Sequence, residues 1–127
     1  MGEVSSDFVG YLYLDLYDRD GKSPGAYMLP LEPGYIRPNG DRHYPTAGLV
    51  TNFKKAMNES ETPSLLASYD MTTIMHELGH CMHHLSCLVR YGTQCGPNGT
   101  PADFTEMPSQ MMEVCETRLH NYNTSSG

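Results

Sequence analysis

The chain has 127 residues, enough for one domain, and its 8 basic against 15 acidic residues give a formal charge of −7, which excludes proteins that bind nucleic-acid phosphates through a basic face. Leu, Ile, Val and Phe make up about 17% of the residues. Chains in which these residues fall below roughly 20% often do not fold on their own. Nine Met and nine Tyr supply other apolar surface, so the composition favours part of a larger protein.

The first half of the chain predicts a small antiparallel sheet. Aromatic and aliphatic residues alternate over residues 10–17 and end at a turn-forming Asp-Arg-Asp-Gly, which is typical of a strand followed by a reversal. Further strands are predicted at residues 26–31 and 47–53, with a hairpin-like region between them. Residues 54–63 are expected to form a polar loop.

The second half predicts two helices, over about residues 70–89 and 103–118, joined by a glycine-rich loop. Asp70 is the expected N-terminal cap of the first helix. At about 100° per residue, the apolar side chains of this helix form one stripe that is expected to face the core. The stripe consists of Met71, Met75, Leu78, Met82, Leu85 and Val89.

The cysteines and the apolar segments bear on the cellular context. No segment approaches the roughly 18 apolar residues of a membrane span, and residues 1–10 lack the features of a secretion signal. We therefore expect an intracellular chain without a membrane partner. The cysteines form no C-x-x-C pair and are too sparse for a secreted disulfide scaffold, so reduced thiols are expected. They are Cys81, Cys87, Cys95 and Cys115.

The first predicted helix contains a complete H-E-x-x-H motif from His76 to His80. Imidazoles four residues apart lie on one helical face and can bind the same zinc ion, while the intervening Glu77 lies beside the reacting water. This composition would produce about 0.02 such matches by chance. Both histidines project away from the apolar stripe, which disfavours the alternative of two histidines buried in a core.

A catalytic zinc ion needs a third protein ligand and an open position. His83 and Ser86 occupy the positions where metzincins have Gly and His, which excludes that class. Glu106 is the candidate carboxylate ligand, although Asp103 and Glu106 also have the spacing of a helix-capping arrangement. The fallback ligands are Glu113 and Glu116.

Other polar residues of the two predicted helices each have two alternative roles. Gln110 or Glu113 could orient a zinc-binding imidazole, and a solvated helix face is the alternative for both. His83 could line the cleft beside the motif, whereas His84 is expected at the surface.

Two segments carry a family resemblance. HELGHCMH at residues 76–83, followed by DFTEMPSQMME at residues 103–113, resembles the active-site core of the thimet oligopeptidase and neurolysin family of zinc peptidases. Upstream segments that also resemble this family lie at residues 13–22, 33–42, 49–53 and 63–66. The resemblance spans about residues 10–115, which is most of the chain.

The resemblance implies one zinc ion held by His76, His80 and Glu106, with Glu77 activating the water that attacks a peptide bond. It implies an α+β fragment, residues 1–127, in which a small antiparallel sheet precedes the zinc helix and a second helix. This would be the partial catalytic domain of a larger, mainly helical metallopeptidase. The implied partners are short peptide substrates and the remainder of the parent peptidase, in the cytoplasm or alternatively the mitochondrion.

Two other functions compete with that of a working metalloendopeptidase. Members of the resembled family place a His and Tyr pair, which steadies the reaction intermediate, beyond the last residue of this sequence. The isolated chain is therefore expected to be impaired, and the first alternative is a truncated, catalytically impaired zinc-binding fragment. The second is an interaction module that uses the Tyr-rich strands, but no specific motif supports this function.

Overall fold

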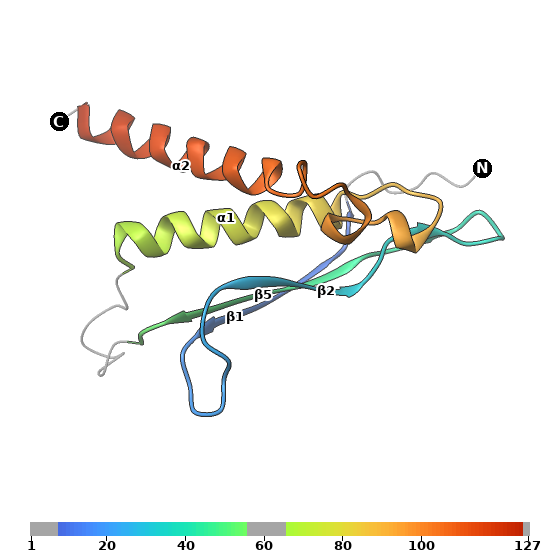
Figure 1. Cartoon of the computed structure of the whole chain (residues 1–127), viewed down its shortest axis with the longest axis horizontal. Coiled ribbons are helices and arrows are strands. Elements are labelled where there is room, and N and C mark those ends of the chain that lie inside the picture. Colours follow the sequence, from blue (N-terminus) through green and yellow to red (C-terminus); the bar gives the residue numbers. More distant parts are fainter. Residues whose placement is uncertain (1–7, 56–65, 126–127) are drawn as a thin grey trace.

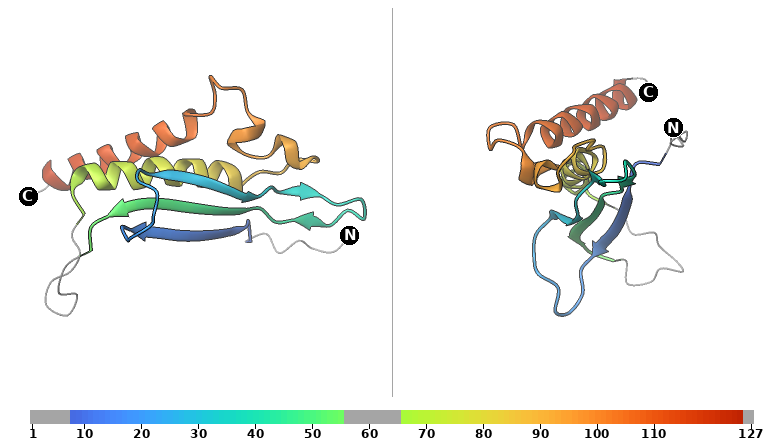
Figure 2. Two further views of the ribbon diagram at one scale, coloured as in Figure 1. Left: turned by 60° about the horizontal axis from the view of Figure 1, so that its bottom comes forward. Right: turned by 90° about the vertical axis from the view of Figure 1, so that its right-hand side faces the viewer.

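The computed structural model describes residues 8–55 and 66–125, and their side chains up to residue 118. In Figure 1, helix α2 lies over helix α1, which in turn lies over a small sheet. Figure 2 shows the same order end-on, with α1 between α2 and the sheet. Most of the loop predicted at residues 54–63 lies outside the described residues. In the part described, no helix is long and apolar enough to cross a membrane.

The main sheet has three strands in the order β1, β5, β2: Tyr11–Tyr17, Thr46–Phe53 and Tyr27–Glu32. β5 pairs with β2 in antiparallel fashion but with β1 in parallel, so the sheet is mixed, and the predicted antiparallel pairing is wrong for β1. β5 is the most buried strand, and the central place gives its backbone a partner on both sides. The predicted hairpin region contains two short antiparallel strands, β3 (Tyr35–Ile36) and β4 (Arg42–His43).

A buried lysine ties the connection after β1 to the centre of the sheet. The ammonium of Lys22 lies 2.9 Å from the backbone oxygen of Asp15, 2.8 Å from that of Tyr17 and 2.5 Å from that of Thr51. It also contacts the Asp15 carboxylate at 3.1 Å. A buried charge is tolerated when it is paired and hydrogen-bonded in this way, so Lys22 links β1 directly to β5.

Helix α1 (Ser68–Leu85) packs on β5 through a core of Ala47, Leu49, Cys81 and Leu85. The buried side of the helix is rotated from the predicted stripe, because the sheet and α2 cover two different sides of the helix. Met71 and Met82 of the predicted stripe are 39% and 48% exposed.

The helix boundaries also differ from the prediction. α1 begins at Ser68, so Asp70 lies inside its first turn, where its carboxylate accepts the N–H of Ala67 at 3.0 Å. The helix ends at Leu85, before Val89. Two 3₁₀ turns, η1 (Gly92–Gln94) and η2 (Pro97–Gly99), lead to α2 (Met107–Ser125), which runs past the predicted end at residue 118.

Candidate metal centre

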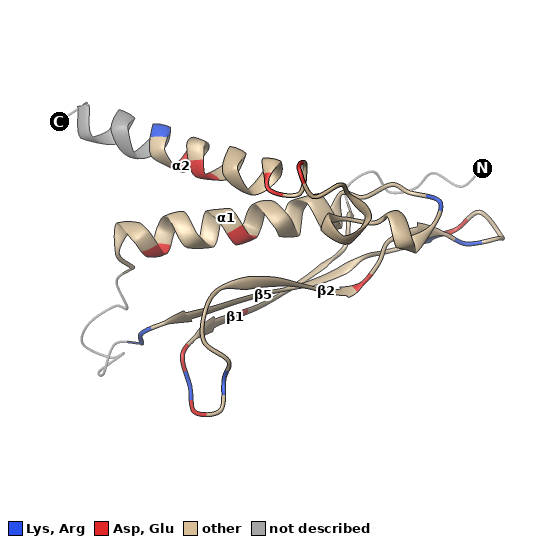
Figure 3. Cartoon of the chain, in the orientation of Figure 1, with Lys and Arg blue, Asp and Glu red and all other residues tan. Residues whose placement is uncertain are grey.

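Helix α1 presents the histidines of the motif on the side that faces the start of α2. The rings of His76 and His80 are 5.0 Å apart, because residues four apart lie one turn from each other on the same face. Figure 3 shows acidic positions on α1 and at the start of α2. The two helices therefore bring imidazoles and carboxylates to one place.

Glu106 approaches both histidines from the residue immediately before α2. Its Oε2 atom lies 3.4 Å from Nε2 of His76 and 3.2 Å from Nε2 of His80. Its backbone oxygen accepts the N–H of Gln110 at 3.0 Å, so Glu106 begins the helical hydrogen-bond pattern. The buried hydroxyl of Ser109 lies 2.9 Å from the same Oε2 atom. Glu106 thus faces the histidines from a position fixed by its own helix.

These three residues have the spacing of a metal site. Their potential ligand atoms all lie within 4.8 Å of one another, and they form the one such group found among the described residues. Ligands about 2.0–2.1 Å from a tetrahedral zinc ion lie roughly 3.3 Å apart, close to the 3.2 and 3.4 Å measured here. The two distances from Glu106 to the imidazoles therefore fit those between the ligands of one zinc ion.

Glu113 takes a position behind His76 rather than among the candidate ligands. Its Oε1 atom lies 2.5 Å from Nδ1 of His76. When Nδ1 carries the proton of this bond, Nε2 keeps a lone pair directed at Glu106. The other fallback ligand, Glu116, lies 3.5 Å from the hydroxyl of Thr72, and Gln110 is exposed. Among the candidate ligands in the described part of the chain, Glu106 is thus the one that contacts both histidines.

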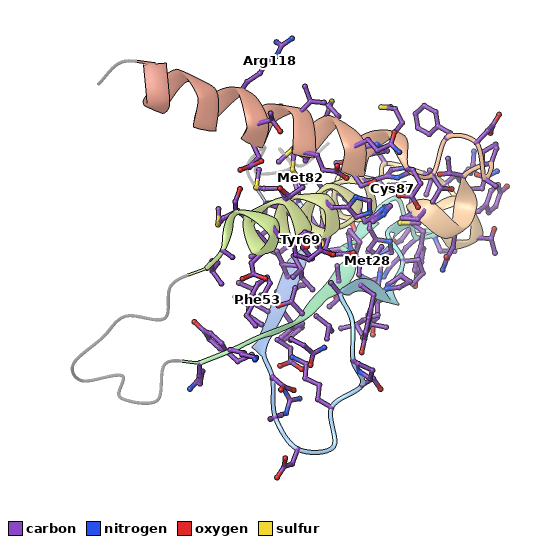
Figure 4. The ribbon with its side chains drawn as sticks, turned by 60° about the vertical axis from the view of Figure 1, so that its left-hand side comes forward. Met28, Phe53, Tyr69, Met82, Cys87 and Arg118 are labelled. Atoms are coloured by element: carbon purple, nitrogen blue, oxygen red, sulfur yellow. The ribbon has the colours of Figure 1, made fainter. Side chains whose placement is uncertain are left out.

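Glu77 is 8% exposed and lines the same cleft as Met28 of β2, which is labelled in Figure 4. Burial raises the pKa of the Glu77 carboxyl above its ordinary value, while the neighbouring charges of His76 and His80 and a hydrogen bond from the Met28 backbone lower it by less. A carboxyl in these surroundings can exchange a proton more readily than an exposed one near neutral pH.

A cleft of about 330 Å³ opens beside the motif. Its walls are His76, Glu77, His80 and Glu106 together with Ala26, Tyr27, Met28, Pro30, Pro97, Asn98 and Thr105. Glu106 is 54% exposed, so the candidate metal position is accessible from this cleft. A larger hollow of about 910 Å³ around Tyr35 and Tyr91 contains none of the motif residues.

His83 and His84, which follow the motif on α1, contact other parts of the fold rather than the candidate ligands. His84 is 1% exposed and its Nε2 atom lies 2.9 Å from the backbone oxygen of Glu32, so its predicted surface position is wrong. The rotation of the helix places His84 against the sheet. His83 is not among the described residues that line the cleft, and its Nε2 atom lies 3.4 Å from the Thr100 hydroxyl.

Sequence reasoning missed Gly79, the residue that lets the two helices approach each other. A Cβ atom at this position would lie 2.6 Å from the backbone oxygen of Pro108 and 2.6 Å from Cα of Ser109. A glycine in the middle of a helix normally costs stability, and its place inside the H-E-x-x-H motif was the available signal. Gly79 therefore sets how closely Glu106 can approach the histidines.

Gly79→Ala is expected to destabilise the chain, although the same change in an exposed helix stabilises it by up to about 1 kcal/mol. The new methyl group would collide with backbone atoms that cannot rotate away, so the free energy of unfolding should fall by about 1–3 kcal/mol. Urea denaturation followed by circular dichroism measures the change. A gain in stability would show that α2 does not pack against Gly79.

Comparison with known proteins gives a consistent family match. The family model described as Peptidase family M3 matches residues 1–126. The chain is 41% identical over 109 residues to the Thimet-like oligopeptidase of Dictyostelium discoideum, covering 86% of this chain and 16% of that protein. It is 40% identical over 109 residues to saccharolysin of Saccharomyces cerevisiae, covering 86% and 15%.

A more distant relative has the same coverage. The chain is 33% identical over 113 residues to the mitochondrial intermediate peptidase of Homo sapiens, covering 86% of this chain and 15% of that protein. The chain therefore spans only 15 to 16% of the length of these relatives.

Proposed function

Because this chain belongs to peptidase family M3, we propose that it carries the zinc centre of a metalloendopeptidase that hydrolyses short oligopeptides. The resemblance inferred from the motifs is confirmed by the family match. The observation that carries the proposal is the convergence of His76, His80 and Glu106 on one point at the edge of an open cleft.

His76, His80 and Glu106 would hold the metal through Nε2, Nε2 and Oε2. When bound, zinc supplies a Lewis acid that lowers the pKa of a water molecule toward 7 and polarises the scissile carbonyl. Two neutral imidazoles and the carboxylates of Glu106 and Glu77 balance the charge of the ion, which favours its binding in a partly buried site.

Glu77 would serve as the general base and then as the general acid. Its carboxylate takes a proton from the attacking water and returns it to the leaving amine, so that one group serves both halves of the hydrolysis. Glu77 is buried and lines the cleft beside Met28, so its carboxylate lies at the wall of the cleft. This position suits a group that must exchange protons without leaving the site.

The names of the relatives agree with a peptide substrate. The first is named an oligopeptidase, the second saccharolysin, and the third a mitochondrial intermediate peptidase. We propose short peptides as substrates, the remainder of a longer peptidase as partner, and the cytoplasm as location with the mitochondrion as alternative. The net negative charge of the chain disfavours a nucleic-acid partner.

Zinc binding and hydrolysis test the proposal together. The purified chain should bind one zinc ion, measured by equilibrium dialysis and metal analysis. A longer product that includes this chain should also cleave a quenched fluorescent peptide in a reaction that a chelator stops and added zinc restores. Failure to bind zinc contradicts the proposed site. Zinc binding by the purified chain without hydrolysis supports the second candidate, a truncated, catalytically impaired zinc-binding fragment.

Two substitutions separate the proposed ligand from the residue behind it. Glu106→Gln replaces an anionic ligand by a weak neutral one, so zinc affinity should fall by orders of magnitude. Glu113→Gln leaves all three ligands in place and weakens only the hydrogen bond to Nδ1 of His76, so the loss should be about 10–100-fold. Titration against a chromophoric chelator measures both values. The reverse ranking would make Glu113 the ligand.

A further inference from the structure

Two cysteines meet beyond the C-terminal end of α1. Cys87 follows the helix by two residues, and Cys95 directly follows η1. The Cys87 sulfur lies 3.8 Å from the backbone oxygen of Gln94 and 3.4 Å from the backbone nitrogen of Gly96. It therefore contacts the residues on both sides of Cys95, which places the two cysteines side by side.

The surroundings of Cys95 hold its sulfur in place. Its Sγ atom accepts the N–H of Gly34 at 3.2 Å and lies 3.6 Å from the backbone oxygen of His84. Cys95 is buried, whereas Cys87 is half-buried. A small oxidant can therefore reach the Cys87 sulfur, while Cys95 is fixed beside it.

The other two cysteines differ from this pair. Cys81 is fully buried in the core, where it packs with Ala47, Leu49 and Leu85. Cys115 is exposed on α2. The thiols at Cys87 and Cys95, with nearby His84, are not among the groups of described residues spaced closely enough for a metal ion. Chemistry between the two sulfurs is therefore favoured over metal binding.

We propose that Cys87 and Cys95 form a reversible disulfide when the chain meets a peroxide. The Cys87 thiolate attacks one peroxide oxygen, the O–O bond breaks, and water leaves after protonation, which gives a sulfenic acid. The Cys95 sulfur then attacks the Cys87 sulfur, the S–O bond breaks, and a second water leaves. Two thiols thus lose two electrons and two protons to one peroxide molecule.

The disulfide would restrain the segment that forms one wall of the cleft. It would join the end of α1 to the residue before Gly96, and Gly96 leads directly into η2. Pro97 and Asn98 of η2 line the cleft beside the histidines. Oxidation should therefore restrain this wall, and any effect on peptide binding rests on the proposed function, whereas formation of the disulfide does not.

The test treats the full chain with hydrogen peroxide, blocks free thiols with iodoacetamide, and maps disulfides by mass spectrometry without reduction. Cleavage after Glu77, Arg90 and Asp103 puts Cys95 alone on the peptide 91–103, separate from the peptide 78–90 with Cys81 and Cys87. We expect these two peptides to be linked, and the link to disappear after treatment with dithiothreitol. It should be absent in Cys87→Ser and Cys95→Ala and retained in Cys115→Ser.

Oxidation in urea provides the control for the folded geometry. In the unfolded chain Cys81 becomes accessible, so a disulfide within the peptide 78–90 should compete with the expected link. A native chain in which both thiols remain open to iodoacetamide after peroxide treatment would overturn the proposal. So would a link from Cys87 to Cys115, or to a second copy of the chain, as the first product.

Discussion

Replacing either histidine of the motif by alanine should lower zinc affinity by about two to three orders of magnitude, since a structural zinc site gains several kcal/mol from each ligand. The two remaining ligands leave the ion half coordinated, and no other candidate ligand group occurs among the described residues. His76→Ala should lose at least as much as His80→Ala, because it also removes the partner of the Glu113 carboxylate. Competition with a chromophoric chelator measures both affinities.

His83→Ala is the matched control for these variants. His83 lies on the same helix, and its ring contacts Thr100 rather than the candidate ligands. The zinc affinity of His83→Ala should stay within about twofold of that of the wild type, because all three proposed ligands remain in place. His84→Ala cannot serve as a control, because His84 is buried against the sheet. Unchanged zinc binding in both His76→Ala and His80→Ala would refute the assigned site.

The local part of the candidate site was predictable from spacing. The helical period fixes the relation of His76 to His80, and their side chains do converge on α1. The approach of Glu106 could not be derived in this way, because it depends on the path of the loop through η1 and η2. The residues alone left it as either a ligand or a cap, and only the family resemblance favoured the ligand role.

The arrangement of layers was less predictable, because it depends on contacts between distant segments. A helical wheel gives the relative directions of side chains but not which side the sheet covers, so Met82 was expected inside and His84 outside. The predicted strand positions were close to those observed. The place of β5 between β1 and β2, however, depends on pairing between strands that are far apart in the sequence. Gly79 required knowledge of the opposing helix, which the sequence of α1 does not contain.

Glu77→Gln should abolish peptide hydrolysis while zinc binding is retained. Glutamine has the same shape and its amide oxygen can still accept a hydrogen bond, so the local fold should persist. It cannot take a proton from water, and the loss of a general base costs about 10²–10⁴ in rate. Hydrolysis of a quenched fluorescent peptide, in a product long enough to cleave it, and metal analysis of the same sample measure the two effects.

Glu116→Gln removes a carboxylate of the same type from α2, where it contacts Thr72 rather than the candidate site. Its turnover should therefore equal that of the wild type, which controls for the loss of one negative charge. If Glu77→Gln instead lost zinc together with activity, Glu77 would be holding the metal site in place rather than moving a proton. If it kept wild-type turnover, the general base would have to be another group lining the cleft, and the accessible carboxylate there is Glu106.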